Sequence, residues 1–314
     1  MAPQRLEFTD RTRCIKPGMG FAGSAERRLE ALAWVPDSDA LAGPWPLALY
    51  CHGTDGSADN ATWLAGALAA DGWLVVAPFF PLTSPATHTR VAGPDISDAG
   101  EQVRDVAFLI DSLLADPAWA ARIDAARIVV LGHSLGAITC WHAAYSAATR
   151  DPRIAAAVML GAGDPVVAAQ HAGIGLADAG PVTGNVPGLL VSADKDLFSR
   201  MMGPPGTAFP RLPGPKCEVT IRGGVHVWFH DGDAWPADHR NPDALWFAAR
   251  SPDMAVPGSE ERVPLIGPQR QREITWAAVR AFLDGHVRGD AGALERLRGL
   301  GMAFDEAAVT LAEG

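Results

Sequence analysis

One short run constrains the fold of this 314-residue chain more than any other. Residues 129–138 read Val-Val-Leu-Gly-His-Ser-Leu-Gly-Ala-Ile, an apolar β-branched stretch that leads into Gly-x-Ser-x-Gly. This pattern predicts a buried strand over residues 126–131, a sharp turn at Ser134 and a helix over residues 135–148. The two flanking glycines would let neighbouring backbone approach a strained serine closely. We therefore expect a strand–turn–helix unit that presents one serine hydroxyl.

The rest of the chain repeats the alternation of strands and helices. We expect strands at residues 5–14, 27–36, 45–52, 73–78, 126–131, 154–160, 188–192 and 217–222. We expect helices at residues 61–70, 98–114, 135–148, 269–285 and 289–301. Such alternation predicts an α/β fold with a mostly parallel, doubly wound sheet and helices on both faces. With 48% hydrophobic residues the chain can bury one large core, so we expect a single domain over residues 1–314.

Two stretches, residues 162–187 and about 231–268, lack regular periodicity. Segments this long inside a compact domain are usually functional or disordered. The second is rich in Pro, Asp and aromatic residues, including Trp235, Trp246 and Phe247. Because large aromatic side chains seldom stay exposed, we expect an ordered flap or cap-like insertion there.

Composition excludes several classes of protein. The formal charge of −10 and the absence of clustered Lys and Arg argue against nucleic acid or an anionic membrane as partner. No stretch of about 18 apolar residues predicts a membrane span, and no amino-terminal signal is visible, so we expect a cytoplasmic protein; a trimmed secretion signal stays an alternative. Four cysteines without metal or redox spacing predict free thiols: Cys14, Cys51, Cys140 and Cys217.

A serine hydroxyl is a weak nucleophile that needs a base, an orienting acid and donors for the developing oxyanion. Asp196 follows the strand at residues 188–192 across a short turn, and we take it as the acid, with Asp194 as the alternative. His226 lies after a Gly-Gly turn just past the strand at residues 217–222, and we take it as the base, with His230 as the alternative.

The other histidines are interpreted as structural: His52, His88, His133, His142, His171, His239 and His286. His52 precedes the serine in sequence, so we expect it to support the loop after its strand instead of acting as the base. His226 and His230 have a spacing that can bind zinc on a helix, but Trp228 and Phe229 between them argue against that geometry. We expect no metal site.

Two main-chain N–H groups are candidates for the oxyanion hole. The first belongs to Leu135, which follows the serine at the start of its helix. The second belongs to Thr54, where Gly53 would permit close backbone approach.

The chain also resembles a known family in several stretches. They are His52-Gly53, Ala77-Pro-Phe-Phe-Pro-Leu-Thr83, the helix at residues 101–111, Gly132-His-Ser-Leu-Gly136, Asp196, and Gly224-Val-His226 with Phe229. Together they make the chain similar to the α/β-hydrolase superfamily, and within it to bacterial esterases like platelet-activating-factor acetylhydrolase, dienelactone hydrolase and chlorophyllase. The likeness covers about residues 5–230 and the carboxyl-terminal helix. The insertion at residues 231–268 matches nothing in this family.

The resemblance implies a carboxylesterase-like serine hydrolase with the triad Ser134, Asp196 and His226, oxyanion donors Thr54 and Leu135, and no cofactor. It implies a small to medium, apolar ester or lactone as substrate. Alternatives on the same triad are an acyltransferase and a polyester-active esterase, and a ligand-sensing protein is the alternative outside enzymes. The natural ester, its acyl length and the oligomeric state stay open.

An apolar pocket is expected beside the serine. Its candidate lining residues are Met201, Met202, Phe209, Trp228, Trp235 and Trp246. Ordinary core packing is an equally good interpretation of these six side chains.

Overall fold

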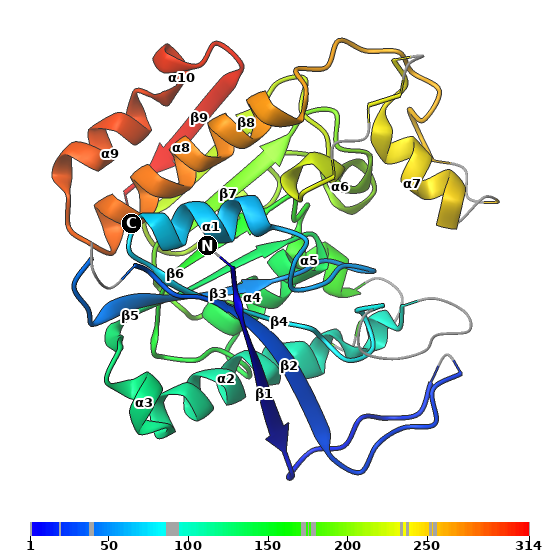
Figure 1. The fold of residues 1–314 in the computed structure, drawn as a ribbon. Helices are drawn as coiled ribbons and strands as arrows, with labels where there is room; N and C mark the ends of the chain where they lie inside the picture. Colours follow the sequence, from blue (N-terminus) through cyan, green and yellow to red (C-terminus); the bar gives the residue numbers. More distant parts are fainter. Residues whose placement is uncertain are drawn as a thin grey trace.

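The computed structural model describes residues 2–18, 20–37, 41–85, 94–170, 174, 176, 180–232, 235–236, 239–250, 253 and 256–313. Within these residues one nine-stranded sheet has the order β1-β2-β4-β3-β5-β6-β7-β8-β9 (Figure 1). The strands are β1 Gln4–Asp10, β2 Arg27–Trp34, β3 Trp45–Cys51, β4 Leu74–Pro78, β5 Ile123–His133, β6 Ile154–Leu160, β7 Gly188–Ala193, β8 Lys216–Ile221 and β9 Ala307–Ala312.

The centre of the sheet is parallel and its edges are antiparallel. Strands β4, β3, β5, β6, β7 and β8 pair in parallel, whereas β1, β2 and β9 join through antiparallel pairs. Strands β3 and β4 are buried along their whole length, and β6 and β7 nearly so. Parallel strands read as continuous apolar runs because helices cover both of their faces. The predicted mostly parallel, doubly wound sheet is confirmed.

Two helical layers enclose the sheet (Figure 1). Helices α2 (Ala99–Ala115) and α4 (Leu135–Tyr145) pack on one face, and α1 (Thr62–Ala70) and α8 (Pro268–His286) pack on the other with α9 (Ala291–Arg298). Helix α2 buries Val103, Val106, Ile110 and Leu113, which the helical repeat places on one side.

Short helices complete the fold. They are α3 Pro117–Ala120, α5 Pro165–Gln170, α6 Leu197–Met202, α7 Pro242–Arg250, α10 Leu300–Ala303 and the 3₁₀ turns η1 Ile96–Asp98, η2 Phe209–Arg211 and η3 Val227–Phe229. Helices α6 and α7 contact each other at one end of the molecule (Figure 1).

Several element boundaries differ from the predicted ones. Strand β5 begins at Ile123 instead of residue 126, because Ile123 pairs with Trp45 before a register shift. Strand β1 ends at Asp10, whose carboxylate accepts the N–H of Thr12 at 2.8 Å. Helix α4 ends at Tyr145 because the next residue is extended.

Several elements lie where no regular structure was predicted, among them α3, α6 and three others. Helix α5 lies in residues 162–187, and α7 lies in residues 231–268. Strand β9, a half-exposed and alanine-rich edge strand, pairs with β8 at the sheet edge. These last three elements have only 6, 9 and 6 residues, which is too short for a periodic pattern to be distinct.

The four cysteines are free, with Cys14 exposed and the other three buried. In the part of the chain that the structure describes, no helix has the length and apolar character needed to cross a membrane.

Candidate active site

The direction of chain crossover places the site at the carboxyl ends of the parallel strands. Strand β3 leads to β4 on one side of it, whereas the chain returns through α2 to β5 on its other side. Ligands in open α/β sheets bind where the strand order reverses in this way. Cys51, at the end of β3, pairs with Gly132 of β5, so the loops that follow these two strands lie side by side.

Ser134 occupies a strained turn between β5 and α4. Its φ of 56° and ψ of −121° lie in a region that residues with side chains rarely adopt. A Cβ atom on Gly132 would overlap the carbonyl of Gly136, and one on Gly136 would overlap the carbonyl of Cys51. The N–H of Ser134 donates to the carbonyl of Leu160 at 2.9 Å, which ties the turn to β6. The predicted strand–turn–helix geometry is therefore present.

Asp196 lies against His226. His226 Nδ1 and Asp196 Oδ2 are 2.7 Å apart, and both side chains are buried. Asp196 also caps α6, since its carboxylate accepts the N–H and the hydroxyl of Ser199, each at 2.8 Å. Asp194 has other partners, namely the Lys195 ammonium at 2.7 Å and the N–H of Gly223 at 2.6 Å. Of the two candidate acids, Asp196 is the one hydrogen-bonded to the histidine.

Two opposing effects act on the pKa of His226. Burial lowers this pKa, while the charge and hydrogen bond of Asp196, together with the charge of Asp243, raise it. The net direction is above the ordinary value for histidine. The ring is also held by Phe198, which stacks on it at a centroid distance of 4.1 Å and an angle of 20°.

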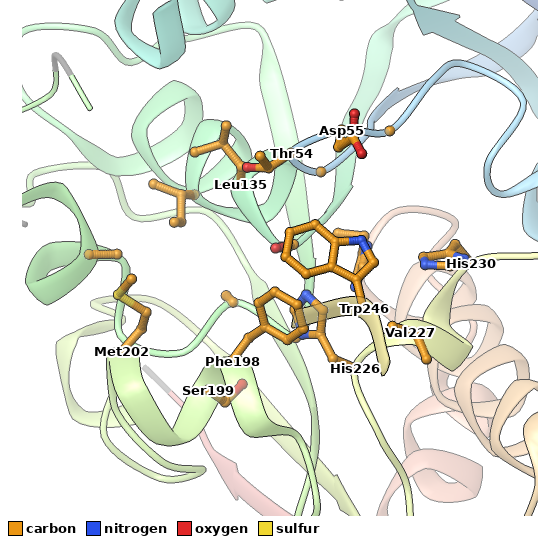
Figure 2. Close-up of a pocket in the computed structure, with 18 of the residues that line it drawn as sticks. Thr54, Asp55, Leu135, Phe198, Ser199, Met202, His226, Val227, His230 and Trp246 are labelled. Atoms are coloured by element: carbon orange, nitrogen blue, oxygen red, sulfur yellow. The ribbon is translucent and has the colours of Figure 1, made fainter. Parts of the chain in front are cut away.

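His230, the alternative base, lines the same cavity. Its Nδ1 accepts the N–H of Gly232 at 3.1 Å. Figure 2 shows its ring apart from that of His226. This arrangement favours His226 as the base that a carboxylate orients.

His52 braces the loop after β3. Its Nδ1 hydrogen-bonds the carbonyl of Gly53 at 2.8 Å, and its Nε2 accepts the N–H of Phe80 at 3.0 Å. Burial lowers the pKa of His52 to about 4, so the ring is neutral and Nδ1 carries its proton. This is the supporting position that the sequence predicted. His88 and His171 lie outside the described residues.

The two predicted oxyanion donors, Thr54 and Leu135, both line the cavity beside Ser134. Figure 2 shows them across the cavity from His226 and Phe198. The loop that carries Thr54 is held by a hydrogen bond from the N–H of Asp55 to the carbonyl of Thr83, at 3.0 Å.

Gly53 fits closely against the turn at Ser134. A Cβ atom there would lie 3.0 Å from the Cβ of Ser134 and 3.1 Å from the carbonyl oxygen of His133. If the N–H of Thr54 is an oxyanion donor, as the sequence predicts, Gly53→Val should shift the loop and lower kcat on a p-nitrophenyl ester by roughly 10²- to 10³-fold. Steady-state kinetics and thermal unfolding check this result. Gly66→Val is the matched control, since a Cβ on Gly66 meets nothing within 4 Å. Wild-type kcat in folded Gly53→Val would rule out this donor.

A cavity of about 480 Å³ opens at the serine. Its lining includes Met201, Met202 and Trp246, as expected. The remaining lining residues are Tyr50, Gly53, Thr54, Asp55, Gly56, Asn60, Ile96, His133, Ser134, Leu135, Ile138, Gly161, Ala162, Ala168, Ile174, Phe198, Ser199, His226, Val227, His230 and Phe247.

The structure corrects three predicted lining residues. Trp228 is fully buried and faces Trp235, with ring centroids 5.3 Å apart, so it packs away from the cavity. Trp235 is 45% exposed and covers Trp228 instead of the serine. Phe209 packs under the Lys216 ammonium, which lies 5.0 Å from its ring centroid. Packing within the protein is the correct interpretation for Trp228 and Phe209, whereas Trp235 lies at the surface.

Sequence reasoning missed Phe198, which stacks on His226, and Asp243, which lies at the start of α7. No periodic signal marks Phe198. Asn241-Pro242-Asp243 is a helix-start pattern, with proline in the first turn and an acidic residue beside it, and it could have located α7.

Comparison with known proteins identifies the fold. No protein-family model and no curated protein matches the chain. Among solved structures it is similar to a ferulic acid esterase from Streptomyces cinnamoneus, with 22% identity, a TM-score of 0.67, and coverage of 99% of this chain and 96% of that chain. The chain therefore has the α/β-hydrolase fold, as predicted. The likeness to platelet-activating-factor acetylhydrolase, dienelactone hydrolase and chlorophyllase stays a prediction.

Proposed function

We propose that the protein is a serine carboxylic-ester hydrolase with Ser134 as nucleophile, His226 as base and Asp196 as orienting acid. One observation carries the proposal: the strained Ser134 and His226 line the same cavity, and Asp196 hydrogen-bonds His226 from behind it. A base held by a third group beside a nucleophile is the arrangement that acyl transfer needs. The esterase named among the solved structures supports the reaction class.

The mechanism follows from the chemistry of these groups. His226 removes the proton of Ser134 as its oxygen attacks the ester carbonyl, and Asp196 holds the imidazole with its proton on Nδ1. The N–H groups of Thr54 and Leu135 stabilise the oxyanion. Protonated His226 then passes its proton to the departing alcohol, leaving an acyl-enzyme. Water activated by His226 releases the acid and restores the serine.

The cavity favours a small to medium ester or lactone with an apolar acyl part. The apolar lining residues Ile138, Ala162, Ala168, Ile174 and Met202 belong to the same packed cluster as Leu135, and we call them the apolar wall. Among the described lining residues, the carboxylate of Asp55 is present and neither Lys nor Arg occurs. We therefore propose a neutral or cationic substrate instead of one that carries a carboxylate or phosphate.

A larger side chain in the apolar wall should lower kcat/KM more for esters with a long acyl chain than for esters with a short one. Ala168, on α5, is buried and lines the cavity. We expect Ala168→Phe to lower kcat/KM for an octanoyl ester by roughly tenfold or more, while an acetyl ester changes by less than about threefold. Gln170→Leu, an exposed position of the same helix, is the control. Equal losses on both esters would place the acyl chain elsewhere.

A series of p-nitrophenyl esters of increasing acyl length tests the proposed function. We expect turnover that depends on chain length, with the free acid as main product. Alcohol and thiol acceptors added to the same reaction distinguish hydrolysis from acyl transfer, since an acyltransferase would divert product to the acceptor. No turnover of any ester by the folded protein would contradict the proposal.

A further inference from the structure

Helix α7 places a carboxylate between the two loops that carry Asp196 and His226. Asp243 is fully buried. Its Oδ2 accepts the N–H of Leu197 at 3.0 Å and the N–H of His226 at 3.1 Å, and its Oδ1 accepts the N–H of Val227 at 3.0 Å. Leu197 directly follows Asp196 in the chain, so one carboxylate joins the backbone of both loops.

Asn241 ties the same carboxylate to the Asp196 loop a second time. Its side-chain carbonyl accepts the N–H of Asp243 at 2.9 Å, and its amide donates to the carbonyl of Lys195 at 2.6 Å. The start of α7 is therefore fixed to the residues on both sides of Asp196.

Aromatic side chains connect α7 with the imidazole from another side. Phe247 stacks on Phe198 at a centroid distance of 4.2 Å and an angle of 29°. Phe198 in turn stacks on His226. Figure 2 shows Phe198 and His226 together beneath Trp246, another residue of α7. The ring of His226 thus rests on a stack that α7 supports.

We propose that Asp243 is a positioning residue that fixes the backbone of the Asp196 and His226 loops and keeps a negative charge beside the imidazole. This inference rests on the proposed function. It assigns to α7, within the insertion at residues 231–268, the role of holding the Asp196–His226 pair together, in addition to forming cavity wall.

The electrostatics agree with this role. Burial raises the pKa of Asp243 to about 6, and the charge of Asp196 raises it as well, against the lowering effects of His226 and the main-chain N–H groups. The carboxyl is therefore ionised at about pH 8. Its charge raises the pKa of His226. Among the described residues, the other titratable groups that contact the ring are Asp196 after β7 and His133 at the end of β5, and His230 after η3 lines the same cavity.

The protonation state of His226 determines in which direction the pH profile of kcat/KM should move. His226 must be neutral to accept a proton, so kcat/KM rises with pH through the pKa of His226. Removing a nearby negative charge lowers that pKa. The acid limb of the profile should then move to lower pH.

Asp243→Asn tests the proposal because it removes the charge but keeps the size. We expect kcat to fall roughly 10- to 100-fold, equally for short and long acyl esters, because an amide NH₂ would face a main-chain N–H. We expect the acid limb of kcat/KM to shift down by about half a pH unit. Asp253→Asn, an exposed carboxylate in the same insertion, is the control and should keep wild-type kcat and pH profile.

Asn241→Ala provides a second variant, which weakens the tie but leaves the charge. We expect a lower kcat with an unmoved acid limb. Wild-type kcat in Asn241→Ala would overturn the proposal even if Asp243→Asn does not fold.

A count of the labelled active sites distinguishes a failure of the positioning role of Asp243 from a failure of the proposed function. Fluorophosphonate labelling gives the number of competent sites, so kcat is expressed per labelled site. Ester turnover and labelling by the wild-type protein test the proposed function independently of Asp243. If the wild type is active but Asp243→Asn shows only a lower Tm, with wild-type kcat per site and an unmoved acid limb, the positioning role fails while the hydrolase assignment stands.

Discussion

Ser134→Ala should lower kcat for ester hydrolysis by roughly 10⁶-fold and leave the fold intact. On the proposed mechanism the serine oxygen forms the bond to the acyl carbon, so its removal eliminates the covalent intermediate and not only one stabilising contact. The surrounding geometry does not depend on the hydroxyl, because the turn is fixed by Gly132, Gly136 and the main-chain hydrogen bond to Leu160. Kinetics on a p-nitrophenyl ester and thermal unfolding of both proteins check the result.

Ser112→Ala, on α2, is the matched control for loss of a hydroxyl. It should keep wild-type turnover. Retention of wild-type turnover by Ser134→Ala itself would mean that another group is the nucleophile.

Asp196→Asn should lower kcat by roughly 10⁴-fold. The carboxylate has three donors around it, from His226 and twice from Ser199. An asparagine must turn its NH₂ toward one of them. If the NH₂ faces His226 Nδ1, the imidazole carries its proton on Nε2 and cannot accept the proton of Ser134. Steady-state kinetics over a range of pH measure the loss.

Asp194→Asn is the control that decides between the two candidate acids. Asp194 contacts Lys195 and Gly223, so we expect a loss of less than about tenfold, from a slightly displaced turn. A larger loss in Asp194→Asn than in Asp196→Asn would reverse the assignment.

Local patterns predicted the parts of the fold that local physics determines. The β-branched run and the two glycines predict the turn at Ser134, because its close backbone contacts leave no room for a Cβ at residues 132 and 136. The predicted bounds of β6 agree with the structure, because its short apolar run lies between Asp151-Pro152-Arg153 and Gly161. The roles of Ser134, Asp196, His226, Thr54 and Leu135 stay predictions that the variants described above test.

Features that depend on distant contacts were not predictable in the same way. Asp243 bonds residues that lie 17 and 46 positions away, and no local pattern encodes such partners. Trp228 and Trp235 are large aromatic residues of the kind that often line pockets, yet their rings pack on each other. An aromatic side chain satisfies its need for burial equally well in the core or in a cavity wall, so sequence alone does not separate the two.

Intact-mass labelling with a fluorophosphonate, on wild-type protein and on Ser134→Ala, tests the central claim most directly. The reagent reacts with a serine activated by a neighbouring base, which is the property that the proposed site must have. We expect one adduct per wild-type chain, located on Ser134, and none on Ser134→Ala. No adduct on folded wild-type protein, or an equal adduct on both proteins, would contradict the assignment of Ser134 as an activated nucleophile.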